Sequence, residues 1–375
     1  MTIQHESSLA RNKAGGIPVS AMEPLREVSR RAGLGKLANQ LSDLRTWMRV
    51  DLEALEAELR SIDGFAEQEL SRDLAQKAAQ HLLERPGKRI RPLCLLLGTQ
   101  LAEESIDSRI RDLAISAELV HAATLLHDDV IDEGSERRGA PAARMVFGNS
   151  ASILAGDYLL IEALGRVQSA GEGFPGREAL LSTLLDTIRE MVAAEAEQLE
   201  RRGRFDPSRA AYLRIIEGKT ASLFRWALQA GAVAAEKPES LIQSLGKVGL
   251  AIGMAFQLVD DLLDLEGDPE EFGKDLFADL EQGKLTWPVI VACEQDPEIE
   301  AHVKMLYSSS QEGTLESDDL IKLVHRIRDT GALEATREMA RTQQQIAQEE
   351  LSGVPDGLAR RALETVIGAA VERSR

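Results

Sequence analysis

Cysteine is scarce in this 375-residue chain. The only cysteines are Cys94 and Cys293, both in apolar stretches, which argues against a disulfide framework and for a reducing compartment, the cytoplasm. No run approaches the roughly 20 apolar residues needed to span a bilayer, and the N-terminus lacks the apolar core of a secretory signal. The sequence therefore predicts a cytoplasmic protein that does not span a membrane.

Positive charge is also in short supply. Asp and Glu number 62 against 44 Lys and Arg, which gives a net charge of -18. Because nucleic-acid backbones are held by basic patches, broad nucleic-acid binding is excluded as a function class. A polyanionic substrate would be repelled as well, unless metal cations or local Lys and Arg residues reverse the field at its site.

Strong helix formers fill most of the chain. Ala, Leu, Glu and Arg recur throughout, aromatic residues make up 4%, and there is neither strand–helix alternation nor a glycine-rich phosphate loop. Helical periodicity begins at Leu44, and residues 147–168 and 244–265 are apolar nearly all round, as central helices are. We predict an all-α fold, with a mobile N-terminal extension over 1–43 and a single helical domain over 44–375.

Two acidic segments, DDVID and DDLLD, begin at Asp128 and Asp260. Asp132 follows Asp128 by four residues, so on a helix both carboxylates project from one face, and Asp264 repeats this spacing in the second segment. One such segment alone is more often a solvated helix end. Here both segments interleave with leucine and valine at the ends of apolar helices, which places their carboxylates at the rim of the core.

Carboxylates this close together are costly without a counter-ion. Oxygen ligands without neighbouring cysteine suit Mg²⁺, which usually binds one or two carboxylates together with waters and substrate phosphates. Two facing clusters could hold several such ions around a diphosphate and stabilise it as a leaving group. The predicted chemistry is the Mg²⁺-assisted ionisation of a diphosphate ester.

Basic residues at helix starts and in loops could bind the phosphates. They lie in four places: the turn with Lys88, Arg89 and Arg91, the pair Arg137 and Arg138, the pair Lys219 and Thr220, and the loop with Lys274 and Lys284. A helix N-terminus favours anions, so a bound phosphate would explain the first cluster. His121 could donate to phosphate or lie satisfied in the core, and the residues alone leave both open.

These segments together resemble the trans-isoprenyl diphosphate synthase family over nearly the whole chain from about residue 44. The resemblance rests on GKRIRP, DDVID followed by RRG, the GD of ILAGDYLL, GKTASLF, FQLVDDLLD and GKDLFADLEQGK. It implies a single large bundle of antiparallel helices around a central cavity, of the isoprenoid synthase type. It also implies a homodimer that uses Mg²⁺ to condense isopentenyl diphosphate with an allylic diphosphate into a polyprenyl diphosphate.

The resemblance implies a role for each site residue. The Mg²⁺ ligands would be Asp128, Asp129, Asp132, Asp260, Asp261 and Asp264. Isopentenyl diphosphate would be bound by Lys88, Arg91, His121 and Arg138. The allylic diphosphate or its metals would contact Arg137, Lys219, Thr220, Gln257, Lys274 and Lys284. The residues expected to matter most for catalysis are Asp128, Asp132, Asp260, Lys219 and Lys274.

The length of the product should depend on the residues just before the first acidic segment. In short-chain relatives an aromatic ring there plugs the tube that receives the growing chain. Here Ala123 and Thr124 occupy that region, and 111–127 contains no Phe, Tyr or Trp. We therefore predict a medium or long product, octaprenyl-like in length, although Tyr158 or Met191 on another wall could shorten it.

Three other functions stay open: a short-chain (geranylgeranyl or farnesyl) diphosphate synthase, a class I terpene cyclase, and a non-catalytic subunit of a synthase. Cyclases usually carry Asn, Ser and Glu in the second acidic segment, and non-catalytic subunits typically lose aspartates. Both segments are intact here, which favours the polyprenyl diphosphate synthase.

Overall fold

The computed structural model describes residues 22–31, 34–62, 74–101, 105–172, 176–266, 279, 282–312 and 317–372. These residues are helical except for turns, short connections and one antiparallel pair of two-residue strands, β1 (Glu136–Arg137) and β2 (Ala140–Pro141). The all-α prediction is confirmed. Among the described helices, none has both the length and the apolarity to cross a bilayer.

The first part of the chain forms α1 (Glu23–Arg31), α2 (Gly35–Trp47), α3 (Arg49–Arg60), α4 (Leu74–Leu83), α5 (Ile90–Gln100), α6 (Ser108–Ile131), α7 (Ala143–Phe147), α8 (Asn149–Gly171) and α9 (Arg177–Arg201). The second part forms α10 (Arg209–Ile216), the π-helical turn η1 (Glu217–Ala221), α11 (Ser222–Ala234), α12 (Glu239–Glu266), α15 (Trp287–Gln295), α16 (Pro297–Gln311), α17 (Ser317–Asp329), α18 (Ala332–Leu351) and α19 (Leu358–Val371).

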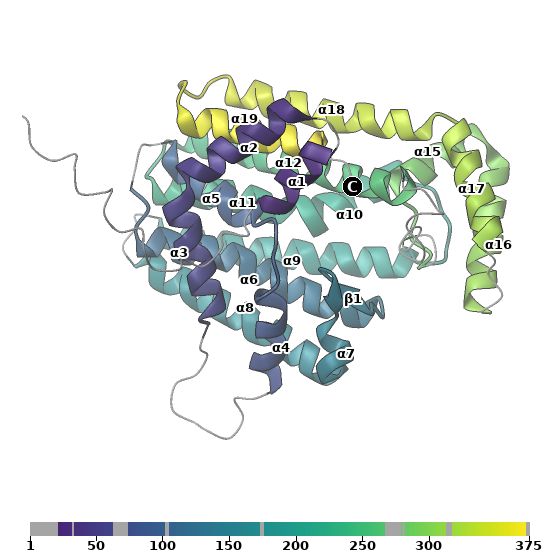
Figure 1. Ribbon diagram of the computed structural model, residues 1–375, viewed down its shortest axis with the longest axis horizontal. Coiled ribbons are helices and arrows are strands. Elements are labelled where there is room, and N and C mark those ends of the chain that lie inside the picture. Colours follow the sequence, from purple (N-terminus) through teal and green to yellow (C-terminus); the bar gives the residue numbers. More distant parts are fainter. Residues whose placement is uncertain are drawn as a thin grey trace, which may run out of the picture.

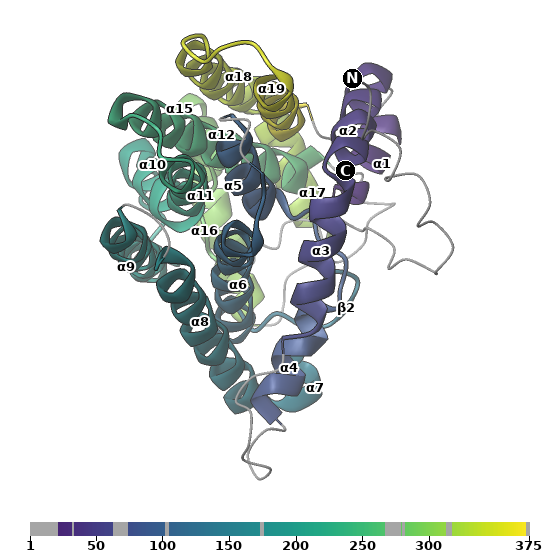
Figure 2. The same cartoon turned by 90° about the vertical axis from the view of Figure 1, so that its left-hand side faces the viewer.

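Helix α6 lies at the centre of the bundle. It packs against α5, α8 and α11, and more lightly against α3 and α4. Figure 2 shows α8 and α9 on one side of α6 and α3 and α4 on the other. Helix α12 packs between α11 and α18, and α15, α16 and α17 form one end of the molecule (Figure 1). The two helices that carry the acidic segments, α6 and α12, are thus both interior.

The described part of the N-terminal region belongs to this bundle, which corrects the predicted extension over 1–43. Leu37 and Leu41 of α2, together with Leu44 just beyond the predicted boundary, are no more than 5% exposed and share one core cluster with α5, α6 and α8. Their spacing of three or four residues places them on one face of a helix, a signal that the surrounding Gly and Pro residues obscure. Residues 1–21 lie outside the described residues.

Local signals fix the ends of the helices that carry the site. The Asp107 side chain caps α6 by accepting a hydrogen bond of 2.9 Å from the Ile110 N–H. The helix ends at Ile131, and Glu133 takes a left-handed φ of 54° that turns the chain away. A Cβ on Gly253 would lie 2.4 Å from the Ala221 Cα, so this glycine allows α12 to approach η1 closely. The first acidic segment therefore occupies the last turn of α6, opposite η1 and α12.

Candidate active site

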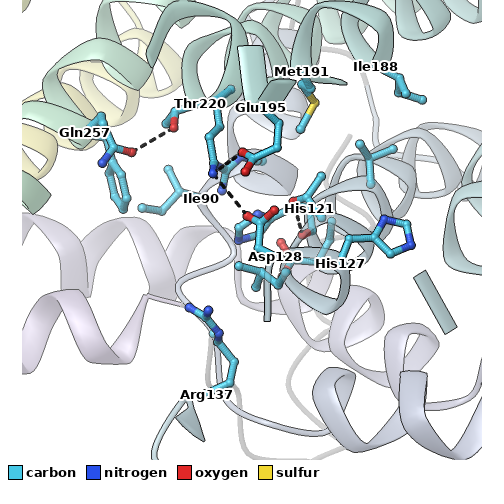
Figure 3. A pocket seen from close by; sticks show the side chains of 18 of the residues that line it. Ile90, His121, His127, Asp128, Arg137, Ile188, Met191, Glu195, Thr220 and Gln257 are labelled. Carbon is cyan, nitrogen blue, oxygen red and sulfur yellow. Dashed lines mark hydrogen bonds and ion pairs between the residues drawn. The ribbon is translucent and has the colours of Figure 1, made fainter. Parts of the chain in front are cut away.

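A cavity of about 900 Å³, which we call the main cavity, lies between α5, α6, α8, α9 and α12. Figure 3 shows Thr220 and Gln257 on one side, Asp128 and Glu195 facing each other in the middle, and Met191 on the other side. Charged residues from the basic turn 86–91, β1 and the end of α6 line one part. Apolar residues line the other: Leu160, Ile188, Met191, Val192 and Leu199.

A second cavity of about 360 Å³, the side cavity, lies beside the first. The two share Asp128, Lys219, Thr220 and Gln257 in their linings. Its other lining residues include Asp132 and Asp261 of the two acidic segments, Arg202 at the C-terminal end of α9, and Lys284 before α15. The structure therefore brings both acidic segments to one site, as the sequence predicts.

Asp128 lies where the two cavities join, opposite η1. Lys219 extends from η1 with its Nζ 3.8 Å from the Asp128 carboxylate, forms an ion pair with Glu195, and donates a hydrogen bond of 2.8 Å to Gln198. Burial raises the pKa of Asp128 to about 6, and Glu195 adds to the rise while Lys219 opposes it. A π-helical turn is rare and commonly marks a functional site, and here it presents Lys219 and Thr220 to the cavities.

Asp132 is held by two cations. Lys284 donates a hydrogen bond of 2.8 Å to it, and Arg202 forms an ion pair with its other oxygen. Burial acts to raise the pKa of Asp132, but Lys284 and Arg202 outweigh that effect and the net shift is downward. Asp132 is thus ionised, with cationic side chains beside both of its oxygens.

The second acidic segment divides between the cavities. Asp260 lines the main cavity, whereas Asp264 is half-buried and lines neither. Asp261 is 2% exposed and accepts hydrogen bonds from the Tyr212 hydroxyl and, at 2.9 Å, from the Gln257 amide. Burial raises the pKa of Asp261 to about 7, and the nearby charge of Asp279 adds to the rise.

Asp129 and Arg137, both predicted to serve the ligands, contact each other. The Arg137 Nε and Nη2 atoms lie 2.9 and 2.5 Å from the Asp129 carboxylate, which is 1% exposed and lines neither cavity. Arg137 itself lines both cavities. The structure therefore places Asp129 as the buried partner of Arg137 and away from the cavity surface.

The predicted isopentenyl diphosphate residues gather at the charged end of the main cavity. Lys88 lies 4.9 Å from the centre of the Phe256 ring, and the Arg91 guanidinium lies 4.5 Å from that of Phe224. Burial lowers the pKa of Arg91 to about 10, so it remains charged at neutral pH. Burial, with Arg91 and the other arginines nearby, holds the pKa of His121 well below its usual range, so its imidazole is neutral.

The structure separates the two residues predicted to set product length. Thr124 lines the main cavity, and its hydroxyl donates a hydrogen bond of 2.8 Å to the His121 carbonyl. Ala123 is fully buried in the core and lines neither cavity, because it projects from a different face of α6. Met191 lines the main cavity and Tyr158 does not. Lys274 lies outside the described residues.

Several residues of the site were not found from the sequence. Arg202 and Tyr212 contact aspartates of the two acidic segments, yet neither belongs to a recognised motif. Ala194 lies against η1: a Cβ on Gly218 would lie 2.8 Å from the Ala194 methyl carbon. The glycine at 218 therefore leaves room for Ala194, whose neighbour Glu195 still reaches Lys219.

Comparison with known proteins defines the class. Residues 72–324 match the family model described as polyprenyl synthetase. The chain is 32% identical over 323 residues to the heptaprenyl diphosphate synthase component 2 of Bacillus subtilis (strain 168), covering 86% of this chain and 87% of that relative.

Two solved structures are similar in fold and sequence. A decaprenyl diphosphate synthase from Rhodobacter capsulatus matches with a TM-score of 0.79 and 32% identity, covering 89% of this chain and 99% of that one. A polyprenyl synthase from Caulobacter crescentus CB15, complexed with calcium and isoprenyl diphosphate, matches with a TM-score of 0.78 and 31% identity, covering 88% and 97%.

The all-helical bundle with two acidic segments at one site is that of an isoprenoid synthase. The chain belongs to the polyprenyl synthetase family, and its enzymatic class is that of a trans-prenyl diphosphate synthase.

The metal-free chain should respond to pH through Asp261. Its pKa is raised from 3.8 to about 7, so between these values the folded state binds a proton that the unfolded state does not. The contribution of Asp261 to the free energy of unfolding therefore falls as pH rises from about 3.8 to about 7. Urea unfolding in EDTA should show Asp261→Asn more stable, relative to wild type, at about pH 8 than at about pH 5. An equal difference at both values would contradict the raised pKa.

Proposed function

We propose that the chain condenses isopentenyl diphosphate with an allylic diphosphate within the main cavity, using Mg²⁺. The observation that carries this proposal is the lining of one cavity by cations, by aspartates of both acidic segments and by an apolar wall. Figure 3 shows Asp128 between Arg137 on one side and Met191 and Ile188 on the other. Isopentenyl diphosphate would lie against Lys88, Arg91 and Arg138. The allylic diphosphate would lie near the acidic segments, with its prenyl tail along the apolar walls.

The residues present fit a hard divalent cation. Around the junction of the cavities the candidate ligands are carboxylate oxygens, which Mg²⁺ prefers. Among the described residues, no three or more His, Cys, Asp or Glu side chains already form a metal-binding group. Lys219, Lys284 and Arg202 instead neutralise the carboxylates. Bound Mg²⁺ would supply Lewis-acid stabilisation of the diphosphate leaving group.

The chain's own residues would then bind and orient the substrates. Lys219, Lys284 and Arg202 are already close to the acidic segments and can turn from the carboxylates to phosphate oxygens. Thr220 and Gln257, which share a hydrogen bond of 2.9 Å, fix the wall between the two cavities. The neutral His121 can donate to a phosphate oxygen through one ring N–H. The departing diphosphate can accept the proton that the product loses, so no protein base is required.

Replacing Asp128 by Asn should lower kcat/KM by about 100-fold or more, because the amide cannot replace a carboxylate that supports several kcal/mol of charge stabilisation. Incorporation of labelled isopentenyl diphosphate measures the effect, and EDTA should abolish incorporation by wild type. The matched control is Asp356→Asn. The Asp356 side chain is 74% exposed and lies outside both cavities, so this variant should leave the rate unchanged. Comparable rates for the two variants would overturn the assignment.

The apolar walls favour a medium or long product, with octaprenyl as the proposed length. Within the described lining of the main cavity, Phe256 is the one Phe, Tyr or Trp, and it lies beside Lys88 at the charged end. The apolar part is lined by aliphatic side chains and Met191 from α6, α8 and α9. Among the described residues of these three helices, no Phe, Tyr or Trp lines the main cavity.

Thr124→Phe should shorten the product, because a ring at this lining position fills space that a further prenyl unit needs. Chromatography of dephosphorylated products measures the length. Thr124→Val, which keeps the volume, should leave the product unchanged. Ala123→Phe should instead lower stability without a matching change of length, because it overpacks the core. A wild-type-length product from folded Thr124→Phe would place the limit on α8 or α9.

We also propose that the chain forms a homodimer through α8 and α9. These helices expose large apolar side chains that line neither cavity: Ile153, Leu154, Ile161 and Leu185. An exposed apolar surface of this kind suits a protein partner. The partner we propose is a second copy of this chain. Light scattering on the purified chain should give twice the monomer mass together with turnover; a monomer that needs a second component would contradict this. Cytoplasmic location stays a prediction from cysteine content.

A further inference from the structure

A network of buried charges lies under the charged end of the main cavity. Arg89 is at its centre, with a fully buried side chain that forms ion pairs with Glu118 of α6 and, at 3.4 Å, with Glu56 of α3. The same guanidinium donates to the carbonyls of Leu83 and Arg85 at 3.1 and 3.2 Å. Each of the three guanidinium nitrogens of Arg89 therefore has a protein partner at the lining of the main cavity.

Glu118 extends the network to the cavity surface. Its side chain is 3% exposed, and its Oε1 atom faces both Arg89 and, at 3.5 Å, the Nη2 atom of Arg138. A carboxylate beside a diphosphate site would normally repel the ligand. Here Arg89 and Arg138 together balance the charges of Glu118 and Glu56, and Arg60 lies a further 4.0 Å from Glu56, so the network leaves no net negative charge at the site.

The other side of the Arg138 guanidinium is left for a ligand. Its Nη1 atom is buried and has no hydrogen-bond partner among the described residues. A Cβ on Gly87 would lie 3.1 Å from this atom and 3.0 Å from Nη1 of Arg89, so the glycine leaves room for both guanidinium groups. A buried donor without a partner is costly, and a phosphate oxygen entering beside Gly87 would satisfy it.

We propose that Glu118 is a positioning residue for the isopentenyl diphosphate site. It orients the Arg138 guanidinium, and it is held in place by its ion pair with Arg89, which also pairs with Glu56. The inference rests on the proposed function, because it takes this end of the cavity as the isopentenyl diphosphate site. Glu118 touches no substrate. It orients the cation that does.

The test is a double-mutant cycle with Glu118→Gln, Arg138→Met and the double variant, each assayed with one substrate varied and the other saturating. Glu118→Gln should raise KM for isopentenyl diphosphate by about ten-fold, as expected when a charged hydrogen bond stops orienting its partner. The KM for the allylic substrate should stay within about two-fold. In the Arg138→Met background, Glu118→Gln should change KM by less than about two-fold, because its target is gone.

The matched control is Glu58→Gln, which removes a surface ion pair with Arg111 and should leave both KM values unchanged. Glu118→Asp, which keeps the charge, should recover much of the isopentenyl diphosphate affinity. If Glu118→Gln does not fold, Glu56→Gln, which removes the partner of Arg89, replaces it in the same cycle.

Equal effects of the Glu118 substitution in both backgrounds, or KM values that rise alike for the two substrates, would overturn the positioning role and indicate a general packing role. A wild-type chain that shows no saturable use of isopentenyl diphosphate would instead overturn the proposed function, so the two failures are distinguishable.

Discussion

The structure depends on keeping carboxylates charged inside a helical bundle. Desolvation and mutual repulsion raise the free energy of several aspartates held at two interior helix ends. The chain offsets this with cations: Lys219 near Asp128, and Lys284 and Arg202 on Asp132. At Asp261, whose hydrogen-bond partners among the described residues are Tyr212, Gln257 and the Trp287 N–H, burial raises the pKa to about 7. The site is therefore arranged for additional positive charge, and a metal-bound diphosphate can release the protein's own cations to the phosphates.

Helix α6 joins the three parts of this arrangement. Glu118 supports the cationic end, Thr124 lines the cavity about two turns further on, and Asp128 lies in the last turn of the helix, at the acidic centre. Because these residues share one helix, their spacing is fixed by the helical rise and does not depend on loops. The facing elements, η1 and α12, are held close by Gly253. Substrate positions and product length are thus coupled through a single rigid element.

Much of the fold and part of the site could be predicted from the sequence, because helical periodicity and the acidic motifs are local signals. The spacing of Asp128 and Asp132 predicted that their carboxylates project from one face of a helix, and the order of the motifs indicated the family. What could not be predicted depends on tertiary packing. Which face of α6 turns toward the cavity separates Ala123 from Thr124, and the pairing of Asp129 with Arg137 requires β1 to fold back. The π-helical turn likewise has no sequence signal that periodicity detects.

The central claim is that both acidic segments bind divalent cations together with a diphosphate, in place of the lysines and arginines that now neutralise them. A crystal structure with Mn²⁺ and an unreactive allylic diphosphate, read by anomalous scattering, tests it most directly. The account predicts metal peaks at Asp128 and Asp132 and at Asp260, with Arg202 and Lys284 moved to phosphate oxygens. Metal peaks confined to surface acids, with the Asp132 ion pairs intact beside a bound diphosphate, would contradict it.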